Sequence, residues 1–228
     1  MKKITLLLIV LILFNKGFAQ DLLKPNYSTK SHETLELDKI TSTKDSTYFN
    51  FVLTNRLVGS TFCADRNIVI LSNNPTKQYK LIKAIGIPVC PQQYTFAYLL
   101  EKMRFTLVFP ALDTAIKVVD IYEMCLDACF SYRGVVINKN LNNALETAYF
   151  DYSSGRYEKA IIGFLKIIEN YPDYNYGITF INIIRIYADL KKLDLAKLYY
   201  HKLLNSNVFD KQQAIEIIKN SKYFNSIN

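Results

Sequence analysis

The chain has 228 residues, 14% of them aromatic, and a formal net charge of +8 at pH 7. Its lysines and arginines are scattered and never form a block of five, so the charge pattern argues against a nucleic-acid-binding protein. The length suffices for one large domain or two small ones.

The first 19 residues have the pattern of a secretory signal peptide. Two lysines precede an apolar run over residues 4–14 that contains one polar residue, Thr5, and is too short to span a bilayer comfortably. Gly17 and Ala19 place small residues at the two positions that a signal peptidase reads. We therefore expect an exported protein, located in the periplasm, at the outer surface or outside the cell, whose mature chain begins at Gln20 without a membrane anchor. The segment carries three lysines and no acid, so its removal lowers the formal charge from +8 to +5.

After the signal peptide, the sequence predicts a polar lead-in, a segment without strands, over residues 20–33. A disulfide-containing β-sandwich is predicted over residues 34–139. Apolar and polar residues alternate along 46–55 and 104–110, as expected for half-buried strands. Further short runs rich in β-branched and aromatic residues occupy 67–72, 79–84 and 116–122. Several short strands separated by turn residues predict an antiparallel Ig-like sandwich, with a barrel as the alternative.

The chain has four cysteines, and all follow the expected signal peptide: Cys63, Cys90, Cys125 and Cys129. An even number in an exported protein predicts disulfides. Four cysteines allow three pairings, of which we favour Cys63–Cys90 with Cys125–Cys129. The alternative is a thiol-disulfide activity of Cys125 and Cys129, although three residues separate them instead of the two of thioredoxin-type enzymes. Zinc would require closely spaced pairs of ligands, so no metal site is expected.

Residues 140–228 change to helical periodicity. The clearest case is 155–172, where apolar side chains recur every three or four residues and Pro172 follows the expected helix end. Asp210, with Gln213 three residues later, predicts an N-cap and a capping box for the last helix. We expect five helices joined by short loops.

Two segments of this half repeat with an offset of 36 residues. The equivalent pairs are Tyr157 and Leu193, Ala160 and Ala196, Phe164 and Tyr200, and Ile167 and Leu203. The pattern resembles the tetratricopeptide (TPR) repeat, whose helical hairpin has a small residue, Gly-x-Tyr, Ala, Phe or Tyr, and Pro at fixed positions. Those positions are filled in the first repeat by Ala148, Gly155, Tyr157, Ala160, Phe164 and Pro172. The second repeat departs from the pattern at Ile184, Lys191 and Val208.

The TPR resemblance implies repeats over residues 141–174 and 177–209, a capping helix over 210–224, and a concave face that binds protein. Carried over by position, that face would hold Asn142, Leu145, Tyr149, Tyr152, Ile181, Arg185 and Asp189. Tyrosine and arginine most often anchor interfaces, so Tyr149, Tyr152 and Arg185 are the leading candidates. The alternative is that the apolar members of this face pack on the β-sandwich.

Residues 34–138 resemble the N-terminal β-sandwich of exported bacterial proteins of unknown activity. The resemblance rests on the phrases GSTFCADRNIVIL, GIPVCPQQYTF, RFTLVFPAL and MCLDACFSYRGVVI. It implies a fold and a location and leaves the activity open. Tyr94, Phe96 and Tyr98 alternate and either stack on a carbohydrate or peptidoglycan ligand or form the core side of one strand, which we favour.

Catalytic patterns are weak. His32 lies in the polar lead-in and His201 on a predicted helix, and no serine or cysteine motif accompanies either. The seven glycines are dispersed, so no phosphate-binding loop or cofactor is expected. The sequence therefore predicts a non-enzymatic protein-interaction module of the bacterial cell envelope, with a carbohydrate-binding β-sandwich or a thiol-active protein as alternatives.

Overall fold

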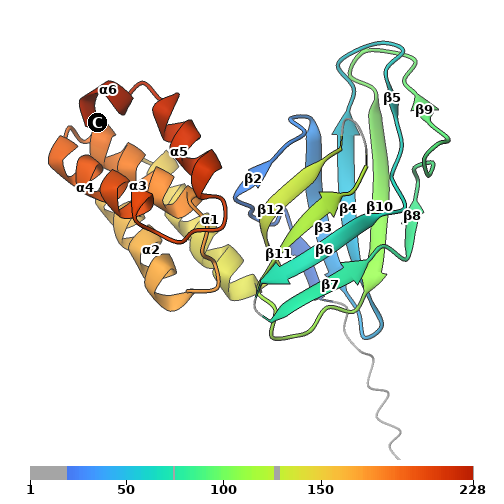
Figure 1. Ribbon diagram of the computed structural model, residues 1–228, viewed down its shortest axis with the longest axis horizontal. Coiled ribbons are helices and arrows are strands. Elements are labelled where there is room, and N and C mark those ends of the chain that lie inside the picture. The colour runs from blue at the N-terminus through green and yellow to red at the C-terminus, as the bar shows by residue number, and fades with distance from the viewer. Residues whose placement is uncertain (1–19, 74, 126–128, 228) are drawn as a thin grey trace, which may run out of the picture.

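The computed structural model describes residues 20–73, 75–125 and 129–227, so the expected signal peptide lies outside the described residues. Antiparallel β-sheets form residues 20–138, here called the β region, and helices form residues 139–227, the helical region (Figure 1). This confirms the expected order of a β half followed by an α half.

Two five-stranded antiparallel sheets build the β region. Sheet A contains, in spatial order, β1 (Gln20–Leu23), β3 (Leu35–Ser42), β4 (Ser46–Thr54), β10 (Lys102–Pro110) and β8 (Lys83–Ile85). Sheet B contains β2 (Thr29–Lys30), β12 (Ser131–Val136), β11 (Val118–Glu123), β6 (Ile68–Asn73) and β7 (Thr76–Lys80). A small extra pair joins β5 (Thr61–Phe62) to β9 (Tyr94–Thr95).

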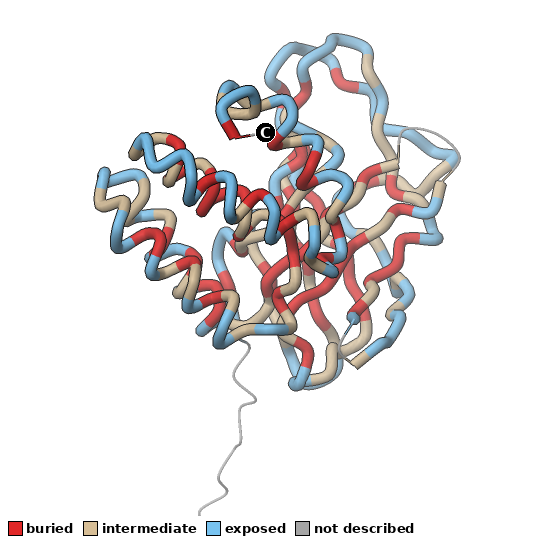
Figure 2. The backbone as a smooth tube through the Cα atoms, turned by 60° about the vertical axis from the view of Figure 1, so that its left-hand side comes forward, coloured by how far each residue is buried: buried red, intermediate tan, exposed pale blue. Residues whose placement is uncertain are grey.

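The two sheets share one core, as the alternation along β4 and β10 predicts. Phe49 and Phe51 of β4 point inward and are buried, while the residues between them are half-buried. The Phe51 ring stacks on Phe105 of the same sheet at 5.3 Å and meets Tyr132 of sheet B at 5.6 Å. Figure 2 shows the buried segments concentrated between the sheets and along the inner faces of the helices.

Two expectations for the β region were wrong. Residues 20–33 are not a separate lead-in, because β1 pairs with β3 and β2 pairs with β12. The run 79–84 is not one strand either: β7 ends at Lys80 in sheet B, and β8 begins at Lys83 in sheet A. The two residues between them carry the chain from one sheet to the other.

Both favoured disulfides are present. Cys63 and Cys90 are bonded with their Cα atoms 5.3 Å apart, and Cys125 and Cys129 with theirs 5.6 Å apart. A backbone bridge between Ala64 and Val89 lies directly beside the first disulfide. Both disulfides belong to the β region and fit an oxidising, extracellular environment.

The helical region contains helices where the periodicity places them, with one addition. Their bounds are α1 (Lys139–Ser153), α2 (Tyr157–Asn170), α3 (Ile178–Asp189), α4 (Leu193–Leu204), α5 (Lys211–Lys219) and α6 (Phe224–Ile227). The expected helix 210–224 is therefore shorter and is followed by α6. Gly155 takes a φ of +73° in the α1–α2 turn, and Lys191 takes +61° at the equivalent place between α3 and α4.

Asp210 does precede α5, but its carboxylate makes no capping hydrogen bond to that helix. The expected capping box was wrong. The side chain is buried and accepts hydrogen bonds from the Gly177 backbone N–H and the Ser28 hydroxyl, each at 2.6 Å. It therefore ties the start of α3 and the β region to the start of α5.

The two regions share a continuous junction. Val118 and Val136 of sheet B pack into the same apolar cluster as Leu141 and Leu145 of α1. Asp120 of β11 is buried beneath it and accepts a hydrogen bond at 2.7 Å from the Tyr176 hydroxyl, which comes from the segment before α3. Within the described ranges, no helix is long and apolar enough to cross a membrane.

Candidate protein-interaction groove

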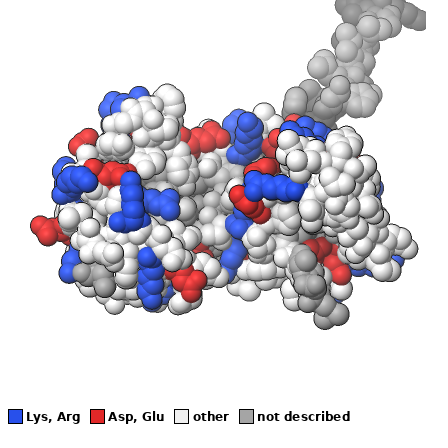
Figure 3. All heavy atoms as spheres, turned by 90° about the horizontal axis from the view of Figure 1, so that it is seen from above, with Lys and Arg blue, Asp and Glu red and all other residues white. Residues whose placement is uncertain are grey.

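A groove of about 780 Å³ lies between the outer face of sheet A and helix α1. Its lining residues come from the β1–β2 segment, three strands and one helix: Lys24, Pro25, Asn26, Tyr27, Glu36, Leu37, Asp38, Val52, Thr54, Lys102, Arg104 and Tyr149. In Figure 3, charged side chains of both signs gather at the waist between the two lobes of the molecule. Junctions of this kind between two folded units are frequent binding sites.

Strand register builds the sheet wall of the groove. Along a strand, alternate residues point away from the core, and Val52 stands between Glu36 of β3 and Arg104 of β10 in one cross-strand row. Lys102 pairs with Thr54 in the next row. The strands thereby bring charges that are far apart in sequence onto one face.

Tyr149 of α1 forms the helical side of the groove. Its ring packs edge-on against Phe164 at 5.3 Å, and its hydroxyl accepts a hydrogen bond at 3.0 Å from the Asn182 side chain of α3. Burial raises the pKa of Tyr149, whereas the Asn182 hydrogen bond and the nearby Arg185 charge act in the opposite direction. The tyrosine is thus a neutral, fixed aromatic wall.

Arg185 of α3 stands beside this tyrosine and is half-buried. Among the described residues it has no carboxylate partner and no side-chain hydrogen bond. Taking a guanidinium out of water without an anion is unfavourable. Arg185 is therefore a cation without a carboxylate partner that stands beside Tyr149, next to the residues that line the groove.

The other charges of the groove are unevenly paired. Glu36 contacts Lys30, and Asp38 lies 3.8 Å from Arg104. Lys24 and Lys102 have no ion-pair partner in the part of the chain that the structure describes. The groove therefore has an excess of positive charge, and it would favour an acidic ligand.

Three of the seven residues predicted to contact a partner are buried, so their assignment to an open binding face was wrong. Leu145 packs in the cluster shared with sheet B, as the alternative interpretation expected. Ile181 packs in a cluster closed by α5 and α6. Asn142 accepts hydrogen bonds from the backbone and side-chain N–H groups of Asn26, at 2.8 and 2.9 Å. These positions would be open only in an isolated hairpin stack.

Tyr152 and Asp189 come together, although away from the sheet wall. The Tyr152 hydroxyl donates to one Asp189 oxygen at 3.3 Å, and the Tyr223 hydroxyl donates to the other. Lys222 lies 3.9 Å from the same carboxylate. Asp189 therefore joins the C-terminal segment to the helices. Of the seven predicted residues, Tyr149 lines the groove, and Arg185 lies beside it.

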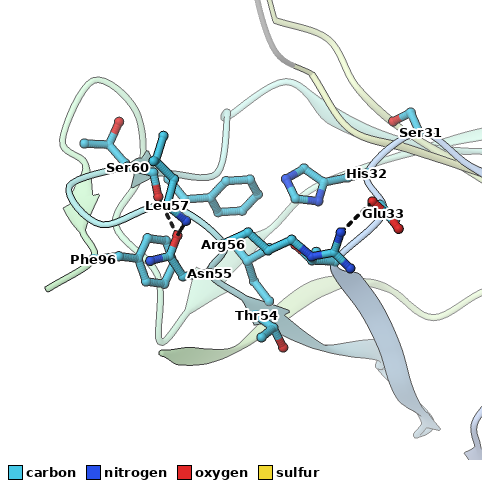
Figure 4. Close-up of a pocket in the computed structure, with 13 residues that line it drawn as sticks. Ser31, His32, Glu33, Thr54, Asn55, Arg56, Leu57, Ser60 and Phe96 are labelled. Atoms are coloured by element: carbon cyan, nitrogen blue, oxygen red, sulfur yellow. Dashed lines mark hydrogen bonds and ion pairs between the residues drawn. The ribbon is translucent and has the colours of Figure 1, made fainter. Parts of the chain in front are cut away.

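A second cleft, of about 360 Å³, opens at the end of the β region and is shown in Figure 4. His32 lies at its wall, edge-on to Phe62 at 5.7 Å, and its buried Nδ1 atom has no hydrogen-bond partner among the described atoms. Burial, followed by the charge of Lys30, lowers the pKa of His32. No serine, cysteine or carboxylate of the described residues is hydrogen-bonded to this imidazole, so the cleft shows no catalytic arrangement.

The three alternating aromatic residues near this cleft differ in burial. Phe96 is buried, as the core interpretation expected, whereas Tyr94 and Tyr98 are exposed. Tyr94 donates its hydroxyl hydrogen to Glu101, which raises the pKa of the tyrosine and lowers that of the carboxyl group. The three rings therefore do not form one flat platform for a sugar.

No metal-binding cluster of three or more ligands occurs in the described ranges. All four cysteines are in disulfides. Comparison with protein-family models finds no match, and comparison with curated proteins finds none either. The functional argument therefore depends on the groove itself.

Proposed function

We propose that this chain is an exported, non-enzymatic protein-interaction module of the bacterial cell envelope, built from an Ig-like β-sandwich and TPR-like hairpins. Its binding surface is the groove between sheet A and α1. The observation that carries the proposal is the half-buried Arg185 beside Tyr149, without a carboxylate partner in the described chain. A carboxylate of a bound partner would supply the missing anion.

The groove also indicates what kind of segment it would bind. Because β4 is paired on both sides by β3 and β10, its backbone cannot accept an added strand. Recognition must use side chains, with Tyr27 and Tyr149 as apolar walls and Lys24 and Lys102 as unpaired cations. We therefore expect an acidic segment of a protein partner, anchored by one carboxylate at Arg185.

Site-specific photo-crosslinking in cells tests this surface directly. A photoreactive amino acid at Lys102, in the groove, should capture one envelope protein, and the same group at Lys219, exposed on α5, should not. Mass spectrometry of the crosslinked peptide should identify a segment rich in aspartate or glutamate. Capture at both positions, or at neither, would contradict the groove as the binding surface.

Charge-matched variants test the role of Arg185. Arg185→Gln should weaken capture from the Lys102 position at least about tenfold, since a charge-assisted hydrogen bond is lost. Arg66→Gln removes the same charge at an exposed position away from the groove and should leave capture unchanged. Equal capture by the two variants would remove the support for Arg185 as the anchor.

Export can be tested independently of binding. Intact-mass measurement of the chain recovered from the envelope should give a mature protein that begins at Gln20. An uncleaved chain in the cytoplasm would contradict the location, and it would leave the groove experiments to be repeated with cytoplasmic partners.

A further inference from the structure

Two loops at one end of the β region expose a cluster of large apolar side chains, which we call the apolar tip. The loops are 56–60, after β4, and 96–101, between β9 and β10. The cluster consists of Leu57, Val58, Tyr98, Leu99 and Leu100, whose exposed fractions lie between 56% and 68%. Figure 1 shows the two loops projecting together beyond the sheets, and Figure 3, which looks onto this end, shows a surface with few charged residues. Apolar groups gathered in this way mark an interaction surface.

The backbone of the apolar tip is hydrogen-bonded within itself. The Gly59 N–H donates to the Phe96 carbonyl and the Leu100 N–H donates to the Asn55 carbonyl, both at 2.9 Å. The Asn55 side chain donates to the Tyr98 carbonyl at 2.9 Å. Its oxygen accepts a hydrogen bond from Ser60 (Figure 4). These bonds leave fewer polar backbone groups to be satisfied by water. In lipid, each unsatisfied group of this kind would be costly.

Leu100 adds a second observation. It has a φ of +64°, in the left-handed region that disfavours a branched side chain, and glycine or asparagine would adopt this conformation more readily. Its side chain is nevertheless 64% exposed, so packing within the chain does not explain the leucine. Leucine is unfavourable in this backbone conformation, and its side chain is not packed within the protein. A contact with an apolar surface outside the chain would explain its presence.

Charge at the apolar tip is arranged for an anionic apolar surface. Glu101, the acidic residue within these loops, is turned inward, where it accepts hydrogen bonds from Tyr94 and from the Ala97 N–H. Lys102 and Arg56 flank the cluster and are exposed, and Arg56 pairs with Glu33 at 2.9 Å. The Glu101 carboxylate is thereby turned away from the cluster, while Lys102, unpaired among the described residues, remains as a cation at its edge.

We propose that the apolar tip inserts into the head-group region of a phospholipid bilayer and holds the protein at a membrane surface. Two projecting loops can enter a lipid interface directly, whereas a protein partner would need a pocket that matches their shape. Tyrosine and leucine are suited to the boundary between head groups and acyl chains, and the unpaired Lys102 beside them is attracted to anionic lipids. The inference shares Lys102 with the groove. It does not otherwise depend on the groove, because a chain can bind membrane, partner or both.

Tryptophan fluorescence provides the test, because the chain contains no tryptophan. Tyr98→Trp places one reporter at the apolar tip, and Phe150→Trp places one on α1 at a residue with the same exposed fraction of 63%. The mature protein is mixed with vesicles of phosphatidylethanolamine and phosphatidylglycerol. We expect a blue shift, and quenching by bromine-labelled lipid, for the Tyr98→Trp protein and not for the Phe150→Trp protein.

Co-sedimentation with the same vesicles measures the contribution of the apolar side chains. The triple variant Leu57→Gln/Val58→Gln/Leu99→Gln should bind at least about tenfold more weakly, since each loses a buried apolar contact with lipid. Its matched control substitutes three exposed apolar residues of the helices: Ile162→Gln, Leu195→Gln and Leu198→Gln. The control should bind vesicles like the wild type.

Four outcomes would overturn the proposal. Wild-type protein that stays unbound, and a Tyr98→Trp emission that vesicles leave unchanged, would both exclude insertion. Equal losses in the tip and control variants would show that vesicle binding has no preference for the tip. A dimer in sedimentation velocity that the tip variant dissolves would assign the surface to a second copy of this chain.

Discussion

The β region and the helical region bury their apolar side chains in different ways. The main β core is formed only by residues between 22 and 135 and lies between two sheets of the same region. The first helical cluster instead includes Val118 and Val136, which belong to sheet B. The β region thus completes its own core, whereas α1 and α2 use the sheet as part of theirs.

The junction between the two regions also contains buried polar contacts. Asp120 of the β region accepts from Tyr176 of the helical region, and Asp210 of the helical region accepts from Ser28 of the β region. Each carboxylate is buried and accepts one hydrogen bond from the opposite region, so a shifted docking would remove one hydrogen bond from each. The groove lies between the same two regions, so these contacts also fix the position of its helical wall relative to sheet A.

The largest effect should come from Asp120→Ala. The carboxylate also accepts from the Gly134 N–H at 2.7 Å and from Arg133 at 3.3 Å. The substitution therefore leaves a half-buried cation without its carboxylate and several buried donors unpaired. We expect a loss of about 4 kcal/mol in the free energy of unfolding, measured in urea. Asp120→Asn, which keeps an acceptor, should lose about 2 kcal/mol.

Glu158→Ala serves as the control for that comparison. It breaks a loose ion pair with Lys192, at 3.9 Å, in which both side chains are largely exposed, and it should leave stability unchanged within error. If Asp120→Ala also changed nothing, the junction would not be the element that unites the two regions.

A nearly equal effect is expected from the disulfide that closes the longer loop. Cys63 and Cys90 are 27 residues apart, and loop-closure entropy gives about 3.5 kcal/mol for a loop of this length. Cys125 and Cys129 are 4 apart, for which the same relation gives about 2 kcal/mol. Paired alanine variants, unfolded in urea, should follow this order; a reversed order would show that native contacts, rather than chain entropy, dominate.

Gly177→Ala tests the packing of the helical region against itself. A Cβ atom at this position would lie 2.3 Å from the Cβ of Ala214, so α3 and α5 would have to separate. We expect a loss of about 2 kcal/mol in unfolding free energy. The double variant Gly177→Ala/Ala214→Gly should recover most of it, and failure to recover would show that the contact is not the cause.

Strands with regular alternation were predictable from the sequence, and those with interrupted alternation were not. Phe49 and Phe51 reveal β4 by their spacing, but β3 has a register shift between Leu37 and Lys39 that breaks its period. In β12, Arg133 and Gly134 separate Tyr132 from Val135, and Gly134 has a φ of +64°. Alternation in the sequence identifies strands that are regular, and β3 and β12 are not.

The candidate site was predictable only on its helical side. Helical spacing and the repeat placed Tyr149 and Arg185 on neighbouring helices, and the structure brings them together. The sheet wall depends on the pairing of β3, β4 and β10, which are distant in sequence. Asn142 could not be recognised as buried, because its partner Asn26 lies 116 residues away.

The smallest expected effect is a pH dependence of the unfolding free energy that comes from His32 in the β region. Burial and Lys30 lower the pKa of His32 from its ordinary value of 6.5, so the unfolded chain takes up a proton at that position more readily than the folded one. Stability should therefore rise with pH up to about 6.5 and be lost as the pH falls towards the lowered pKa. His32→Gln should flatten this part of the curve, measured by urea unfolding between about pH 5 and about pH 8.

The histidine of the helical region provides the comparison. His201→Gln, at an exposed position on α4, removes the other imidazole of the chain and serves as the matched variant. Subtracting each variant's curve from that of the wild type isolates the single group from the carboxylates that titrate in the same range. A His32 difference curve that is flat would show that the unpaired Nδ1 gains a partner on protonation, and that the cleft at the end of the β region tolerates the charge.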